Sequence, residues 1–167
     1  MSKQFYDYLI RLNEYDRRIK LSDTLAISLM EFKSHWEKFA SEFRFAYRNL
    51  VIDFNNDVVT IKIEGNENIA FVANLIDFND EKILKSITMF ASGDGTPQSG
   101  ANMFIAIGVL IASLNPHENA EFRKKIFKEL GINDIKIGTN NALIVNDFKY
   151  AISLTQETGL MFSVSRV

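Results

Sequence analysis

One glycine-rich segment of the chain contains residues that could hold a small ligand or an anion. It reads Ser-Gly-Asp-Gly-Thr-Pro-Gln-Ser-Gly over residues 92–100, where a strand is expected to end and a helix to begin. The backbone N–H groups of such a turn and the N-terminus of the helix form a positive concavity that suits an anion. The predicted ligand-binding residues are Ser92, Gly93, Gly95, Thr96 and Ser99.

The same segment has a plainer interpretation, which the sequence favours. It lacks the Gly-Lys-Ser/Thr ending of a phosphate-binding loop and the Gly-x-Gly-x-x-Gly fingerprint of dinucleotide-binding folds. The carboxylate of Asp94 would also repel a phosphate beside it. A tight Asp-Gly turn leading into a helix capped by Thr96 explains the glycines without any ligand, because glycine tolerates positive φ.

A second pattern is a stripe of large apolar residues between residues 25 and 43, repeating at spacings of 4, 3, 4, 3 and 4. This spacing places them on one side of a helix. The favoured interpretation is that the helix packs across a sheet and completes the core. The alternative is that its aromatic members bind a partner, because aromatic side chains often anchor protein interfaces. These members, called the aromatic stripe below, are Phe32, Trp36, Phe39 and Phe43.

Residues for catalysis or metal binding do not form a recognisable motif. The absence of cysteine removes thiol nucleophiles, thiolate metal ligands and disulfides. The two histidines, His35 and His117, have no serine or acid at a motif spacing, and the carboxylates show no calcium-loop spacing. The sequence therefore favours a non-enzymatic protein, with no catalytic residue, no cofactor and no metal site.

Length and composition predict a single globular domain. The chain has 167 residues, of which 47% are hydrophobic and 24% charged, and a net charge of −2. This charge gives no reason to expect nucleic acid or an anionic membrane as a partner. The first twenty residues carry charges throughout and contain no apolar core, so no secretory signal is expected and a cytoplasmic location is predicted.

Helices are expected at the N-terminus and in the middle of the chain. Residues 2–47 should form two helices that break near Leu21, with Ser22 or Asp23 capping the second. A helix should run from Thr96 to Leu114. Its apolar part, residues 101–114, is too short to cross a bilayer and should lie between the sheet and the N-terminal helices. Another helix should extend from 115–116 to 130, with a glycine as its stop.

Strands are expected wherever apolar and polar residues alternate. Four strands with short turns form an antiparallel meander, and three more close the chain; they cover 50–54, 59–63, 69–78, 83–91, 142–145, 148–155 and 160–164. The predicted fold is α+β, with a largely antiparallel sheet and with the N-terminal helices and the central helix pair mainly on one face.

Residues 83–131 resemble a domain found in small uncharacterised bacterial proteins and lipoproteins. The matching features are a strand ending in Ser-Gly-Asp-Gly-Thr at 92–96, Ser-Gly at 99–100, an apolar helix, and a short helix closing on Glu-Leu-Gly at 129–131. The closing strands, with the run at 159–163, look similar too. The chain lacks the lipobox cysteine of the lipoprotein members. The resemblance implies the fold and a bacterial or phage origin, and it brings no activity with it.

These observations predict a protein-interaction module of chaperone-like, immunity or inhibitor type. The order of helices and strands is also similar to that of bacterial secretion chaperones, by architecture alone. The partner would be another protein or a second copy of the chain, bound through the aromatic stripe and the acidic segment 49–100, which holds eight acidic and three basic residues. The alternative function is small-ligand or anion binding by the turn at 92–100.

Overall fold

The computed structural model describes residues 3–167, apart from the side chains at positions 5, 6, 9 and 15–20. The expected start of the first helix at residue 2 lies outside these residues. The elements in chain order are α1 (Lys3–Lys20), α2 (Leu29–Glu42), β1 (Leu50–Asn55), β2 (Val58–Ile63), β3 (Asn66–Phe78), β4 (Glu81–Ala91), α3 (Pro97–Leu114), α4 (Ala120–Glu129), the short 3-10 helix η1 (Ile132–Asp134), β5 (Asn140–Val145), β6 (Phe148–Thr155) and β7 (Gly159–Arg166).

All seven strands belong to one antiparallel sheet, in the order β1-β2-β3-β4-β7-β6-β5. The meander expected from the sequence is confirmed as β1–β4, whose neighbours pair in chain order. The last strand, β7, returns to the middle and pairs with β4, from Ser86 opposite Ser165 to Ala91 opposite Leu160. The α+β class with an antiparallel sheet is therefore confirmed.

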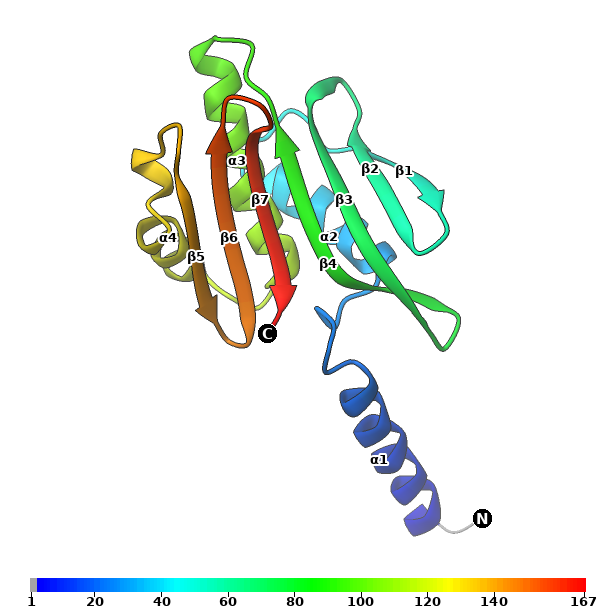
Figure 1. The fold of residues 1–167 in the computed structure, drawn as a ribbon. Coiled ribbons are helices and arrows are strands. Elements are labelled where there is room, and N and C mark those ends of the chain that lie inside the picture. The colour runs from blue at the N-terminus through cyan, green and yellow to red at the C-terminus, as the bar shows by residue number, and fades with distance from the viewer. Residues whose placement is uncertain (1–2) are drawn as a thin grey trace.

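Two helices cover one face of the sheet side by side (Figure 1). Helix α2 lies behind β3 and β4, and the ring centroids of Trp36 and Phe71 of β3 are 5.1 Å apart. Helix α3 lies behind β6 and β7. The expectation that α3 lies between the sheet and the N-terminal helices is wrong. Seven strands about 4.8 Å apart span about 29 Å, which leaves room for two helices of about 10 Å diameter on the same face.

The N-terminal helices behave differently from each other. Helix α2 packs on the sheet as expected, whereas α1 stands away from the body of the protein (Figure 1). The segment between them is attached to β4, because the N–H of Leu25 donates to the carbonyl of Leu84 and Ser28 forms a bridge with Ile83. The expected packing of both helices on one face is therefore correct only for α2.

Two helix caps differ from the sequence prediction. The N-cap of α2 is Ser28, whose hydroxyl accepts from the N–H of Glu31 while the Glu31 carboxylate accepts from the N–H of Ser28. Residues 22–23, the expected caps, come before the segment attached to β4. Helix α2 begins only after that segment. The N-cap of α4 is Asn119 rather than Asn115, because Asn115 instead ends α3.

Helix α3 is the one helix among residues 3–167 that is long and apolar enough to cross a membrane. In this fold its C-terminal half is buried in the core, with fully buried side chains that include Ile107, Leu110 and Ile111. Its N-terminal end lies at the edge of the core, beside the turn at 92–96. The helix thus connects the hydrophobic core to the predicted ligand-binding segment.

Candidate functional site

The aromatic stripe lies in the hydrophobic core. Phe32 and Trp36 have no exposed surface, and Phe39 is also buried. Phe43 is partly buried and packs against the core, with the guanidinium of Arg123 lying 4.8 Å from its ring centroid. The favoured interpretation of the stripe as core is therefore correct. In this fold Phe32, Trp36 and Phe39 are not available to a partner, because α2 uses them to cover the sheet.

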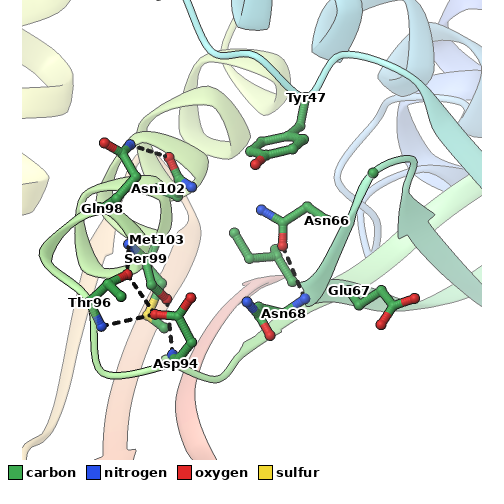
Figure 2. Close-up of a pocket in the computed structure, with 12 residues that line it drawn as sticks. Tyr47, Asn66, Glu67, Asn68, Asp94, Thr96, Gln98, Ser99, Asn102 and Met103 are labelled. Carbon is green, nitrogen blue, oxygen red and sulfur yellow. Dashed lines mark hydrogen bonds between the residues drawn. The ribbon is translucent and has the colours of Figure 1, made fainter.

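The glycine-rich turn forms one wall of a polar cleft with a volume of about 190 Å³. The opposite wall comes from Tyr47 and from the turn between β2 and β3 (Figure 2). The lining residues are Tyr47, Gly65, Asn66, Glu67, Asn68, Ile69, Asp94, Thr96, Gln98, Ser99, Asn102 and Met103. Segments about thirty residues apart in the sequence therefore meet at one site.

The turn itself is held by hydrogen bonds among its own residues. The carboxylate Oδ1 of Asp94 accepts from the hydroxyl of Thr96 at 2.6 Å and from the N–H of Thr96 at 2.9 Å. The Thr96 hydroxyl in turn accepts from the N–H of Ser99, which caps α3. The hydroxyl of Ser99 accepts from the N–H of Asp94. These are the bonds of the N-capped Asp-Gly turn that the sequence favoured.

The hydrogen bond from the Thr96 side chain, followed by that from its backbone, lowers the pKa of Asp94 below its usual value. Asp94 is therefore ionised at neutral pH, and the cleft contains a negative charge at the helix N-terminus. An anion placed there would be repelled by this carboxylate. The arrangement disfavours the anion-binding form of the prediction.

The structure brings only two of the five predicted ligand-binding residues to the cleft, namely Thr96 and Ser99. Ser92 instead ties the turn to the start of β3, because its N–H donates to the carbonyl of Asn68 at 2.9 Å. Gly95 adopts a φ of +86°, which explains why this position holds glycine. Gly93 lies beside Met103, and a Cβ at this position would be 3.4 Å from the methionine methyl group. These three residues shape the turn rather than line the cleft.

The most informative residue of the cleft is Asn66, at the start of β3. Its side chain is almost entirely buried, with 8% of the residue exposed. Its Oδ1 accepts from the N–H of Asn68 at 3.0 Å. Since a backbone N–H can only donate, this bond fixes the orientation of the amide and turns the NH₂ group toward the cleft (Figure 2). Among the residues that the structure describes, no acceptor binds this Nδ2.

Other groups around Asn66 offer further hydrogen bonds and one aromatic ring. Tyr47 is half-buried and its ring lies over Gly65, where a Cβ would be 3.7 Å from the ring. On the opposite wall, Nε2 of Gln98 donates to Oδ1 of Asn102 at 3.0 Å. Glu67 points away from the cleft (Figure 2). The lining residues thus provide several carboxamides, a phenol ring and the carboxylates of Asp94 and Glu67, and none of them is basic.

Sequence reasoning missed Tyr47, Asn66 and Asn102. By local pattern alone, residues 65–68 are an ordinary turn between two strands and Asn102 lies on an apolar helix. The sequence does contain a signal, since a cluster of asparagines between two strands can do more than turn the chain. That signal does not tell which distant segment the asparagines face. Their neighbour is set by the packing of β3 beside the turn at 92–96.

The histidine of α2 has a structural position. Nδ1 of His35 lies 3.0 Å from the carbonyl oxygen of Ser113, so the imidazole links α2 to α3. Within residues 3–167, no group of three or more histidine, aspartate or glutamate side chains could hold a metal ion.

Comparison with known proteins gives no information about the cleft, so its role is argued from its geometry. No family model matches the chain, no curated protein matches it, and no solved structure matches it.

Proposed function

We propose that this protein binds a small, uncharged, hydroxyl-bearing ligand in the cleft between the β2–β3 turn and the start of α3. The observation that carries the proposal is the side chain of Asn66, which is nine-tenths buried and directs an amide NH₂ without a protein acceptor into the cleft. This NH₂ group is open to the cleft, so it can donate to water or to a ligand bound there.

The chemistry of the lining favours hydroxyl groups over charged groups. Carboxamides both donate and accept, and the Asp94 carboxylate accepts, so together they complement hydroxyls, which also do both. Anions are disfavoured because the cleft has a carboxylate and no basic residue. At Asn66 itself the NH₂ group directs its hydrogens into the cleft, which suits a hydroxyl oxygen and not a bare cation.

The size of the cleft and its aromatic ring narrow the ligand further. A volume of about 190 Å³ equals that of about six water molecules at ~30 Å³ each. This is room for one sugar ring or a polyol of similar size. The half-buried Tyr47 offers an apolar face for the C–H groups of such a ring, beside polar partners for its hydroxyls.

The test is a thermal-shift screen of the full chain against monosaccharides and polyols, with amino acids, phosphate and sulfate as the competing classes. A ligand at ten times its Kd stabilises by about 1.4 kcal/mol, which raises the Tm by about 3–5 °C for a chain of this length. We expect such a shift from at least one monosaccharide or polyol, followed by a measurable Kd in calorimetry.

The key variant is Asn66→Asp, which keeps the acceptor for the N–H of Asn68 and removes the donor from the cleft. We expect it to abolish the shift. The matched control is Asn55→Asp, the same change at the exposed last residue of β1, and it should leave the shift intact. The proposal fails if no sugar or polyol stabilises the wild type, or if the Asn66 variant responds as strongly as the wild type.

A further inference from the structure

Helix α1 is an 18-residue helix that stands away from the body (Figure 1). Large apolar side chains on it are exposed, with Tyr8 57% and Leu12 51% accessible. Helices in proteins gain most of their stability by packing an apolar face. Helix α1 therefore needs a packing partner that its own body does not supply.

The sequence of α1 has the pattern of a coiled coil. Phenylalanine, tyrosine, leucine, tyrosine and isoleucine occupy positions 5, 8, 12, 15 and 19, at spacings of 3, 4, 3 and 4 residues. This is the a/d repeat of a heptad, in which two helices wind around each other along one apolar seam. The helix spans about 27 Å at 1.5 Å per residue, long enough for two and a half heptads.

The charged positions beside this seam identify the partner as a second copy in parallel orientation. With position 12 at a, position 11 is a g position and position 16 is the e position of the next heptad. These are the two positions that meet across a parallel two-stranded coiled coil. The sequence has arginine at position 11 and aspartate at position 16, so a parallel pair of these helices would bring opposite charges to these positions twice.

The antiparallel alternative has the opposite electrostatics. In that arrangement g positions face g positions, and α1 has Arg11 and Arg18 there. An arginine of one helix would then face an arginine of the other. We propose that α1 pairs with α1 of a second copy as a parallel two-stranded coiled coil, which makes the protein a homodimer.

The body of each copy is compatible with this arrangement. The segment after α1 is attached to β4 of its own chain through Leu25 and Leu84, so each body keeps its own fold. Since α1 projects from one end of the body (Figure 1), a parallel pair places both bodies at the C-terminal end of the coiled coil. The cleft at Asn66 takes no part in this pairing, so the dimer does not depend on ligand binding.

The first experiment measures the mass of the full chain in solution by sedimentation equilibrium. We expect twice the chain mass of 19.1 kDa for the wild type. Leu12→Glu places a charge in the seam and should give the monomer. The matched control is Ile10→Glu on the same helix, because Ile10 is also exposed, at 43%, but occupies the f position outside the seam. This control should remain a dimer.

The charge pair is tested by reversing the charge at each of its two positions. Arg11→Glu or Asp16→Arg alone converts two attractive contacts into repulsive ones and should raise the dimer dissociation constant about tenfold. The double variant restores opposite charges and should return the constant close to that of the wild type. A purely structural role of either residue would not produce this rescue.

The orientation is tested by disulfide crosslinking, which is unambiguous because the chain has no native cysteine. Tyr8→Cys at a d position should form a disulfide dimer on oxidation, because in parallel helices this position faces itself, whereas Ile10→Cys should not. A monomeric wild type, or a dimer that survives Leu12→Glu, would overturn the proposal. A stable dimer in which Tyr8→Cys fails to crosslink would overturn the parallel arrangement.

Discussion

Nδ2 of Asn115, at the C-terminal end of α3, donates a hydrogen bond to the hydroxyl of Tyr150 in β6 over 3.0 Å. The same Nδ2 also donates to the carbonyl of Ile111 in the last turn of α3, at 2.8 Å. Tyr150 itself has no exposed surface. The pair therefore fixes the end of α3 to β6, the strand next to the sheet edge at β5, and it explains why Asn115 ends α3 instead of capping α4.

Replacing Tyr150 with phenylalanine should lower the free energy of unfolding by about 1 kcal/mol, because Asn115 loses a buried partner while the ring is kept. For a chain of this length the Tm should fall by about 2–4 °C. Urea denaturation at pH 7 measures the change. Tyr8→Phe, at an exposed tyrosine, is the control and should leave the stability of the body unchanged.

The same tyrosine should make stability depend on pH in the alkaline range. Burial raises the pKa of Tyr150 to about 12, from a usual value of 10.0. The folded state therefore keeps a proton that the unfolded chain releases above pH 10, and stability falls as the pH rises from 10 to 12. The expected loss is about 2–3 kcal/mol relative to Tyr150→Phe. The expectation would be contradicted if the unfolding free energies of the wild type and Tyr150→Phe changed in parallel with pH.

Trp36 reports directly on whether the aromatic stripe is core. It is the only tryptophan, and it is fully buried between α2 and β3. Its fluorescence should be blue-shifted in the folded protein and protected from soluble quenchers. Trp36→Ala should destabilise by about 3–5 kcal/mol, whereas Met30→Ala on the same helix, at a position 68% exposed, should change stability by less than about 0.5 kcal/mol. Solvent-exposed emission from the folded wild type would argue against the core position.

Two glycines with similar backbone conformations should respond very differently to alanine. Gly159 has a φ of +70°, and a Cβ there would be 2.6 Å from the carbonyl oxygen of Ala91. Gly95 has a φ of +86° with no atom within 4 Å of the added Cβ. Gly95→Ala should cost about 1–2 kcal/mol from backbone strain alone. Gly159→Ala should cost clearly more, because β7 must also move away from β4. Equal losses in thermal denaturation would contradict this contact.

The hydrogen bonds on Asp94 predict a dependence on acid. Because its pKa is lowered in the folded state, the stability that it contributes is present above its usual value of 3.8 and is lost as the pH falls through the lowered pKa. NMR titration of the carboxyl group measures this directly. Thr96→Val removes the main cause and should raise the pKa toward 3.8, whereas Thr96→Ser keeps the hydroxyl and should leave it low. A pKa that is insensitive to both changes would contradict the hydrogen-bond explanation.

The sequence by itself determined the local elements of this protein. Alternation predicted the strands because each strand has one side toward the core. Asparagine and aspartate at 79–80 and 146–147 indicate turns between strands because these residues tolerate positive φ, and all four have it. The cap of α3 was predicted for the same kind of local reason, since the hydroxyl of Thr96 reaches an N–H only three residues away.

Only the tertiary structure decided which of these elements meet. The spacing of the aromatic stripe indicated a buried side but not that α2 would share a sheet face with α3. The caps at Ser28 and Asn119 were missed because the residues before them have long-range partners, which no local pattern records. The cleft shows the same limit: Asn66 and Asn102 are 36 positions apart, and only the pairing of β3 and β4 brings their segments together. Periodicity indicates that a side chain faces the core. Which residue it contacts in the core is set by the packing of the whole chain.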